Sequence, residues 1–175
     1  MRALWLRFLD WLSTRFGIAR TPVPREPVSF RPIGVVRNGV REPRPDGWDR
    51  LRSDIIVREE LLDGLAGIDG YSHLIVVFAF HRVPDSEQRL QLRPYRGAPA
   101  DQGVFATRSQ LRPNPVGVSV VRLVRRRRNV IWVEGLDAVD GTPVLDIKPY
   151  FPNHDAVPDA RVPAWWDDAA GPDRR

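Results

Sequence analysis

The stretch "HLIVVFAFHRV", residues 73–83, is the segment that says most about the fold. Seven apolar residues follow one another in it without glycine or proline. A run of this kind predicts a central β-strand that is buried on both faces. The chain shows no alternation of strands and helices, and no G-x-G-x-x-G motif opens a helix. A doubly wound nucleotide-binding fold is therefore not expected.

Shorter apolar segments with polar turns between them lie on both sides of this strand. The segment "RRRRN" (125–129) and the dipeptide Asp140-Gly141 read as turns, and "ELLDGLAGIDGYS" (60–72) reads as a short helix or turn. We expect about seven strands, within 28–38, 51–60, 73–83, 103–108, 117–124, 130–136 and 144–147. The predicted fold class is mainly β, as a small closed or partly closed β-barrel.

The first 27 residues differ from the rest of the chain. Residues 1–20 place apolar side chains at steps of three and four, which predicts an amphipathic helix, and the linker 21–27 holds three prolines. The helix could dock on its own domain, form a dimer contact or lie on a membrane surface, and membrane association is the least favoured of these. We expect a domain over 28–165 and a tail over 166–175.

The composition restricts the chemistry. Cysteine is absent, which excludes disulfides, thiolate metal sites and a cysteine nucleophile. The net charge is +5, and 27 residues are Lys or Arg. Among these, Lys148 is the single lysine. The arginine excess reflects either a compositional bias of the genome or a polyanionic partner, since arginine binds phosphate with two parallel hydrogen bonds.

The loop "GVFATRSQLRPNPVG" (103–117) is the best candidate site, because rigidity and polar groups coincide in it. Its two prolines fix the backbone on either side of Asn114. Arg108 and Arg112 can clamp an anion or stack on a ring. Gly117 relieves crowding where the chain re-enters a strand. The competing interpretation is a stiff connection between two strands that carries two solvated arginines.

Three further features carry possible chemistry. His81 ends the buried run and can move a proton near neutral pH. Asp146 shares a strand face with Val144 by simple alternation, so its carboxylate needs a partner such as Lys148. Arg125–Arg128 can contact phosphates, but only Trp132 is near them in the sequence, so base stacking is not indicated. The histidines show no metal-ligand spacing, and we predict no metal.

Together, four segments identify a family. "FRPIGVVRN", "GIDGYSHLIVVFAFHR", "GVFATRSQLRPNPVGVSVVRL" and "LDAVDGTPVLDIKPYFP" are similar to successive signature blocks of the TsaA-like (TrmO) family. The resemblance runs from about Val28 to Phe151. It implies a small β-barrel, usually a homodimer, that binds S-adenosylmethionine without a Rossmann fold. It also implies an enzyme that methylates the exocyclic nitrogen of threonylcarbamoyladenosine beside the tRNA anticodon. We expect a cytoplasmic location, because Arg7 and Asp10 interrupt the apolar core that a signal peptide would need.

The resemblance implies roles for particular residues. We expect the proton acceptor to be His81 or Asp146. The expected cofactor-binding residues are Phe105, Ala106, Thr107, Arg108, Ser109, Arg112, Pro113, Asn114, Asp140, Gly141 and Thr142. The expected contacts to substrate or tRNA are Arg112, Lys148, Tyr150, Arg125, Arg126, Arg127 and Arg128.

Two other functions stay open. One keeps the cofactor but methylates a small molecule or another nucleotide. The other is a protein that binds the cofactor without turnover. The larger bacterial members of the family carry an additional C-terminal domain, whereas this chain ends about two dozen residues after "KPYFP". This difference affects the expectation of which substrate is methylated more than the expectation that the cofactor is S-adenosylmethionine.

Overall fold

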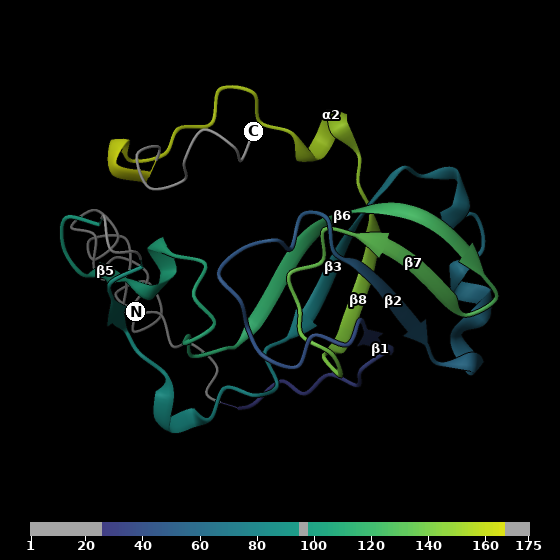
Figure 1. Cartoon of the computed structure of the whole chain (residues 1–175), viewed down its shortest axis with the longest axis horizontal. Coiled ribbons are helices and arrows are strands. Elements are labelled where there is room, and N and C mark those ends of the chain that lie inside the picture. Colours follow the sequence, from purple (N-terminus) through teal and green to yellow (C-terminus); the bar gives the residue numbers. More distant parts are fainter. Residues whose placement is uncertain (1–25, 95–97, 167–175) are drawn as a thin grey trace, which may run out of the picture. The chain divides into compact units, whose positions relative to one another are not determined.

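The computed structural model describes residues 26–94 and 98–166, drawn in colour in Figure 1. Every strand lies in the compact unit that begins at Arg31. The expected amphipathic helix (1–20), most of the proline linker and most of the tail lie outside the described residues.

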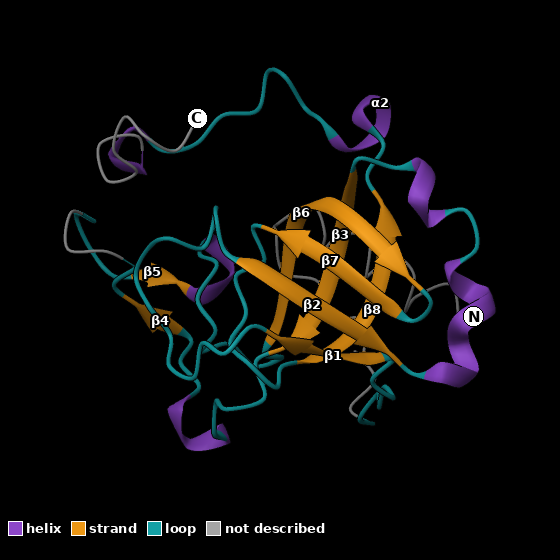
Figure 2. Ribbon diagram, turned by 45° about the vertical axis from the view of Figure 1, so that its right-hand side comes forward, coloured by secondary structure: helices purple, strands orange, loops and turns teal. Residues whose placement is uncertain are grey.

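Six antiparallel strands close into a barrel, as Figure 2 shows. Their order around the barrel is β1-β2-β7-β6-β3-β8. The strands are β1 (Gly34–Arg37), β2 (Arg52–Val57), β3 (His73–Ala79), β6 (Val116–Arg127), β7 (Val130–Glu134) and β8 (Pro143–Pro149). A separate two-stranded sheet pairs β4 (Gln91–Leu92) with β5 (Gln102–Gly103). The prediction of a mainly β, barrel fold is confirmed.

Helices in the described residues are short and lie in the connections. They include the 3-10 helices η1 (Glu59–Leu65), η2 (Ile68–Gly70), η3 (Asp85–Glu87) and η4 (Val104–Ala106), and the α-helix α2 (Pro152–Asp155). Two of them, η1 and η2, occupy the segment expected to be a short helix or turn.

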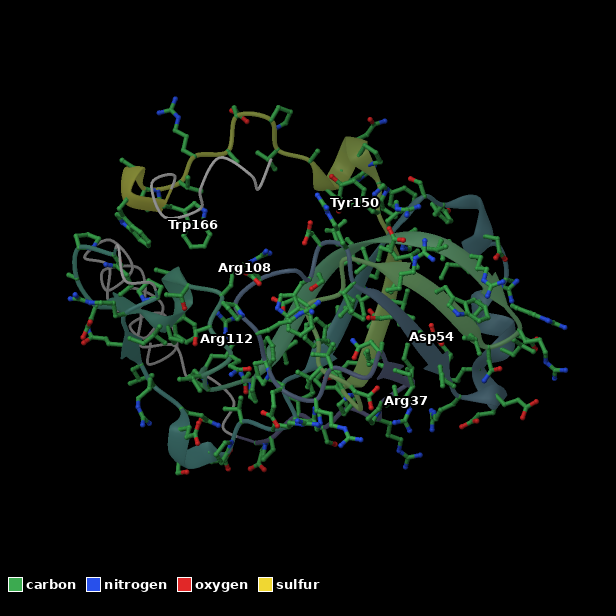
Figure 3. All side chains as sticks on the ribbon, viewed as in Figure 1. Arg37, Asp54, Arg108, Arg112, Tyr150 and Trp166 are labelled. Carbon is green, nitrogen blue, oxygen red and sulfur yellow. The ribbon has the colours of Figure 1, made fainter. Side chains whose placement is uncertain are left out.

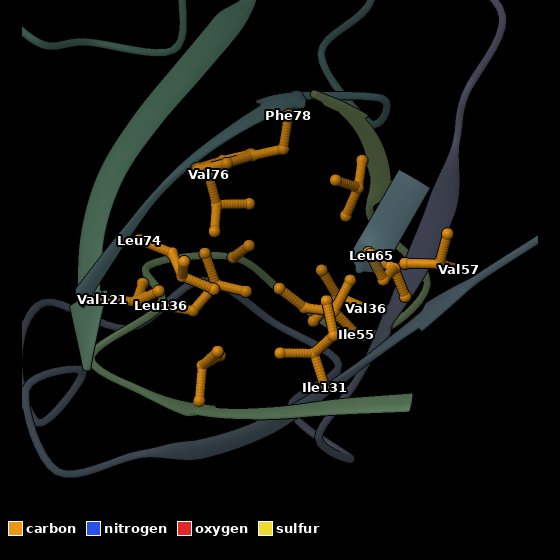
Figure 4. Close-up of a cluster of buried hydrophobic side chains, with 13 residues drawn as sticks. Val36, Ile55, Val57, Leu65, Leu74, Val76, Phe78, Val121, Ile131 and Leu136 are labelled. Carbon is orange, nitrogen blue, oxygen red and sulfur yellow. The ribbon is translucent and has the colours of Figure 1, made fainter. Parts of the chain in front are cut away.

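The core fills the barrel interior (Figure 4). Leu74, Val76 and Phe78 of β3 point inward and are at most 2% exposed. The residues between them are half-buried, because the alternate side chains of β3 face out of the barrel. The expectation that this strand is buried on both faces is therefore wrong, since a closed barrel encloses its core on the inside only.

Three predicted strand boundaries also differ from the structure. The first strand is shorter than 28–38 and begins at Gly34, because Pro32 has no N–H for a ladder. Of the segment 103–108, only Gly103 is in a strand, and η4 follows it. Conversely, 125–129 is not all turn. β6 continues to Arg127, and Arg128 makes the reversal with a φ of 53°.

A bulge in β8 changes which way Asp146 faces. Val77 of β3 pairs with Asp146, but the next residue, Phe78, pairs with Val144, so Leu145 is an extra residue in the ladder. Alternation is broken there: Val144 is fully buried, while the Asp146 side chain is 45% exposed. The expectation that these two residues share one face is wrong for this reason.

Candidate functional site

The candidate loop is fixed to the barrel where β6 begins. Gly117 lies against the buried ring of Phe78, and a Cβ there would be 2.4 Å from two of its ring carbons. Phe78 in turn packs edge to face on Phe80, with ring centroids 5.3 Å apart. The Phe80 N–H donates to the Pro115 carbonyl at 2.8 Å. The prediction that Gly117 relieves crowding is confirmed, and the close approach sets where the loop starts.

Inside the loop, two hydroxyl groups organise the backbone. The Thr107 hydroxyl donates to the Val104 carbonyl at 2.8 Å and accepts from the Ser109 N–H at 3.2 Å. The Ser109 hydroxyl accepts from the Leu111 N–H at 3.1 Å. Such local side-chain bonds satisfy backbone groups that a strand would have paired. The segment therefore turns instead of continuing as a strand.

The two loop arginines have different surroundings. Arg112 donates from Nε to the Ser109 carbonyl at 2.9 Å and from Nη2 to the Thr107 carbonyl at 2.7 Å. Its guanidinium therefore holds the loop together. Arg108 is exposed, and no ion pair or hydrogen bond of its side chain is formed within residues 26–94 and 98–166. Figure 3 shows both on the loop. Arg108 is thus the loop arginine whose charge is available to a ligand.

A cavity of about 220 Å³ lies at the same end of the barrel. It brings together two predicted site residues, His81 and Thr142, with Gln110 of the loop. The whole lining consists of Glu42, Pro43, Trp48, Phe80, His81, Arg82, Val83, Glu87, Gln110, Asp137, Ala138, Val139 and Thr142. The other predicted cofactor contacts on the loop and at Asp140 and Gly141 do not line it.

Sequence reasoning missed most of the cavity wall. Among the missed wall residues, Trp48 is the one that the sequence indicates, because a tryptophan within the polar loop "REPRPDGWD" needs another side chain to pack against. In the structure its ring lies under the Arg44 guanidinium, 4.9 Å from the ring centroid. Its indole N–H donates to the Arg44 carbonyl at 2.8 Å. Glu42, Glu87 and Asp137 carry no comparable signal in the sequence.

His81 is a titratable group of the cavity, and its surroundings shift its proton affinity. Partial burial, followed by the charge of neighbouring Arg82, lowers the pKa of His81 below the ordinary 6.5. The Arg82 guanidinium is held by the Arg41 and Asp140 carbonyls. At neutral pH the imidazole is therefore uncharged and able to accept a proton.

Asp140 lies in the connection that precedes β8, and its carboxylate is hydrogen-bonded to the connection between β1 and β2. Its Oδ1 accepts from the Asn38 and Gly39 N–H groups at 2.9 and 3.2 Å. Its Oδ2 lies 3.3 Å from Arg37 Nη1. These contacts, with the two N–H groups as the main causes, lower the pKa of Asp140. Gly141 follows with a φ of 82°, so the predicted Asp-Gly turn is confirmed. The carboxylate serves the fold of this region.

Asp146, Lys148 and Tyr150 lie on β8 or just after it and do not reach the cavity lining. Lys148 Nζ is 2.6 Å from Asp146 Oδ2, so the expected partner of this carboxylate is confirmed. Tyr150 packs against the ring of His73 at the opposite end of β3 from His81. Of the two candidate proton acceptors, only His81 lines the cavity.

The arginine run forms the end of β6 and the tip of the β6–β7 hairpin. Arg125 lies over Trp132, 4.1 Å from the ring centroid. Arg126 pairs with Asp69 at 2.7 Å, and Arg128 pairs with Glu59 at 3.3 Å. Arg127 is exposed and makes no ion pair in the described part of the chain. Two of the four guanidinium groups are thus neutralised by acidic partners.

The hairpin lies far from the loop along the same strand. Ten residues separate Val116 from Arg126, roughly 33 Å of strand at about 3.3 Å per residue. Between them, Glu134 accepts from Arg52 at 2.9 Å and also pairs with Arg122. These two hydrogen bonds lower the pKa of Glu134. The structure therefore places the predicted phosphate contacts and the predicted cofactor contacts at different ends of the barrel.

Two kinds of feature are absent from the described residues. No group of three His, Asp or Glu side chains is placed to hold a metal ion within them, and the expectation of no metal stays a prediction. No helix in the same part of the chain is long and apolar enough to cross a membrane.

The comparisons with known proteins agree with this picture. Residues 39–156 match the model of the tRNA-methyltransferase O N-terminal domain. A probable S-adenosyl-L-methionine-binding protein of Pyrococcus abyssi is 38% identical over 140 residues, which cover 77% of this chain and 74% of that protein. The tRNA (adenine(37)-N6)-methyltransferase of Escherichia coli is 42% identical over 143 residues, 75% of this chain and 61% of that protein.

A solved structure shares the fold. The crystal structure of TrmO from Pseudomonas aeruginosa aligns with a TM-score of 0.66 at 35% identity. The alignment covers 82% of this chain and 63% of that one. The chain thus spans less than two thirds of this structure and of the Escherichia coli enzyme. The match at residues 39–156, which contain five of the six barrel strands, the candidate loop and the β6–β7 hairpin, means that the chain belongs to the tRNA-methyltransferase O family.

Proposed function

We propose that this protein transfers a methyl group from S-adenosylmethionine to the exocyclic nitrogen of threonylcarbamoyladenosine beside the tRNA anticodon. The observation that carries the proposal is the cavity in which His81, Gln110 and Thr142 meet beside the rigid loop. Membership of the family supports the reaction class, and the names of the Escherichia coli and mouse relatives support the substrate.

The cavity residues fit the chemistry of the cofactor. Trp48 and Phe80 offer aromatic surfaces, which suit a purine ring and a sulfonium cation. Glu42 and Glu87 offer carboxylates to ammonium or hydroxyl groups. At about 220 Å³ the cavity is smaller than the roughly 300–1,000 Å³ of most ligand pockets, so it would enclose one end of the cofactor. When bound, the cofactor supplies the methyl group as an electrophile.

Within this proposal His81 accepts the proton that the attacking nitrogen loses. Its pKa is lowered by burial, so the imidazole is in the basic form at neutral pH. Asp146 is a weaker candidate, because Lys148 occupies its carboxylate outside the cavity. Positioning by the loop carries the remaining catalysis, since methyl transfer needs alignment of the reacting atoms above all.

Arg108 is the proposed anion-binding residue. The threonyl group of the modified base ends in a carboxylate. Arg108 is exposed on the loop, and its guanidinium has no partner among the described residues. Charge pairing there would select modified over plain adenosine. Arg112 acts as a positioning residue in this scheme, because its donors hold the carbonyls of Ser109 and Thr107.

The tRNA backbone is proposed to contact Arg125 and Arg127 at the hairpin. These two are exposed, whereas the ion pairs with Asp69 and Glu59 hold Arg126 and Arg128. Contacts to phosphate lose affinity as salt is added. Replacing Arg125 and Arg127 by glutamate should weaken tRNA binding and flatten its salt dependence, while the same change at the exposed Arg161 should not.

A homodimer and a cytoplasmic location complete the proposal. The outer face of β6 carries exposed valines, with Val118 at 48%, Val120 at 51% and Val124 at 37% exposure. Such a stripe supports a contact with a second copy. Light scattering on the wild type and on a Val118→Lys variant would test it, and a monomer in both would remove this part of the proposal.

The test of the function is the fate of a labelled methyl group. Purified protein is incubated with methyl-labelled S-adenosylmethionine and with tRNA that contains threonylcarbamoyladenosine, and digested nucleosides are analysed by mass spectrometry. Label on that nucleoside supports the proposal, and tRNA without the modification is the control. If the label appears on another acceptor, a methyltransferase with a different substrate is favoured. If protein that binds the cofactor transfers no label, binding without turnover is favoured.

A further inference from the structure

Exposed aromatic rings gather where β3 begins and β8 ends. Tyr71, just before β3, is 38% exposed, and Phe151, just after β8, is 46% exposed. Their rings meet edge to face with centroids 5.7 Å apart. The ring of His154 in α2 is also close to Phe151, with centroids 6.0 Å apart. We call these three residues the aromatic platform. An edge-to-face pair that is this exposed keeps ring surface open to solvent.

Backbone contacts hold the platform in place. The Phe151 N–H donates to Asp155 Oδ2 at 2.7 Å, and the His154 N–H donates to the Phe151 carbonyl at 2.9 Å. The Tyr71 N–H donates to the Ile68 carbonyl at 3.2 Å at the end of η2. The rings are therefore presented by two short helical turns. A ring held in this way loses less conformational entropy on binding than one on a free segment.

The platform lies beside the arginine run, although the two are far apart in the sequence. The Leu123 N–H donates to the carbonyl of Ser72, the neighbour of Tyr71, at 2.8 Å. Asp69, two residues before Tyr71, accepts from Nε and Nη2 of Arg126 at 2.9 and 2.7 Å. Proximity in the sequence indicated only Trp132 near the arginines, and the fold adds the platform.

Three acidic side chains of this region have partners of their own. Asp69 is paired with Arg126, Glu59 with Arg128, and Asp155 with the Phe151 N–H. The exposed positive charges of Arg125 and Arg127 are therefore left without a neutralising partner in the described residues. Cationic groups next to open aromatic rings are the combination that proteins use to bind single-stranded nucleic acid.

We propose that the aromatic platform stacks unpaired bases of a single-stranded RNA loop whose phosphates lie along Arg125 and Arg127. The inference rests on the proposed function in that it takes RNA as the substrate, and it adds a site for the bases. Unpaired loop bases expose the ring faces that stacking requires, whereas the bases of a duplex are stacked on one another. The platform should therefore prefer a hairpin loop over a duplex.

The test compares a fluorescein-labelled RNA hairpin with a blunt duplex of the same stem, by anisotropy with the full chain. The double variant Tyr71→Leu, Phe151→Leu keeps apolar bulk but removes both ring faces. We expect its affinity for the hairpin to fall about tenfold or more, since each stacked base contributes roughly 1–3 kcal/mol. Its affinity for the duplex should stay unchanged. The matched control is Phe30→Leu, an exposed ring that belongs neither to the platform nor to the candidate site.

Three outcomes would overturn the inference. The first is unchanged hairpin affinity in the double variant, and the second is an equal loss from Phe30→Leu. The third is a loss that accompanies dissociation of an oligomer in light scattering, which would make the platform a contact between copies of the chain. Methyl transfer by the wild type is measured separately. Hairpin binding that depends on the rings, without methyl transfer, would reject the proposed reaction and keep the RNA site.

Discussion

Charged residues have different roles at the two ends of the barrel. At the loop end, the Arg112 guanidinium donates to backbone carbonyls and the Asp140 carboxylate accepts from backbone N–H groups. At the hairpin end, Arg127 and Arg125 face solvent, and Arg125 covers an aromatic ring. These charged side chains at the loop end therefore stabilise the backbone. At the hairpin end, two of the four arginines make no ion pair in the described residues and can bind a partner.

The largest effect expected from this division is at His81. The variant His81→Gln keeps a polar side chain in the cavity but removes the basic nitrogen. Methyl transfer should fall by about 10²–10⁴-fold, the usual contribution of a general base. Cofactor affinity should change little. Single-turnover transfer and equilibrium binding of the cofactor measure the two quantities.

The pH profile tests the same residue in a second way. Because the pKa of His81 is lowered, its basic form persists as the pH falls, and the acid limb of the wild-type rate should have its midpoint below about 6.5. The limb should be missing from the residual rate of His81→Gln. A variant that keeps both the rate and the limb would remove His81 from the reaction.

The next effect is on stability, at the point where the loop joins the barrel. Gly117→Ala places a methyl group 2.4 Å from the Phe78 ring, which is 2% exposed and has little room to move. We expect a loss of about 1–3 kcal/mol in the free energy of unfolding. Urea unfolding measures it, and an equally stable variant would contradict the close packing described here.

A smaller stability effect is expected at Asp140. The contribution of this carboxylate is present above its ordinary pKa of about 3.9 and is lost as the pH falls through its lower folded pKa. Asp140→Asn should therefore cost about 1 kcal/mol at pH 7, a modest value because the side chain is 25% exposed. The difference should disappear in strong acid. Urea unfolding of both proteins at several pH values tests this, and a constant difference would reject the carboxylate as its cause.

The smallest effects should come from the hairpin ion pairs. Arg126→Ala and Arg128→Ala each remove one pair on the surface, so each should cost less than about 1 kcal/mol of stability. Thermal unfolding provides the measurement. A loss as large as that of Gly117→Ala would erase the contrast between the two ends, because the hairpin end would then also serve the fold.

How much of the structure could be predicted from the sequence depends on the range of the interactions. The barrel class followed from local apolar runs, and the crowding at Gly117 and the Asp140-Gly141 turn followed from glycine. The bulge at Leu145 could not be predicted, because it is defined by pairing with β3 rather than by its own neighbours. The extension of β6 through three arginines was missed for the same reason, since their pairing with β7 overrides the polar local sequence.

For the candidate site, too, predictability depends on how far apart in the sequence the residues lie. The loop and His81 were found because each stands out within a few residues of sequence. The cavity wall at Glu42, Glu87 and Asp137 was not, since it is assembled from segments far apart in the chain. Likewise the aromatic platform joins residues 71 and 151, which no window of sequence contains together.

In the proposed scheme, one end of the barrel carries out the reaction and the other holds the RNA. The decisive measurement is the rate of methyl transfer as a function of the concentration of tRNA that contains threonylcarbamoyladenosine, for the wild type and for Arg125→Glu, Arg127→Glu. We expect a raised KM with an unchanged kcat in the variant, the signature of lost uniform binding. A lowered kcat at saturating tRNA, or an unchanged KM, would contradict this division of roles.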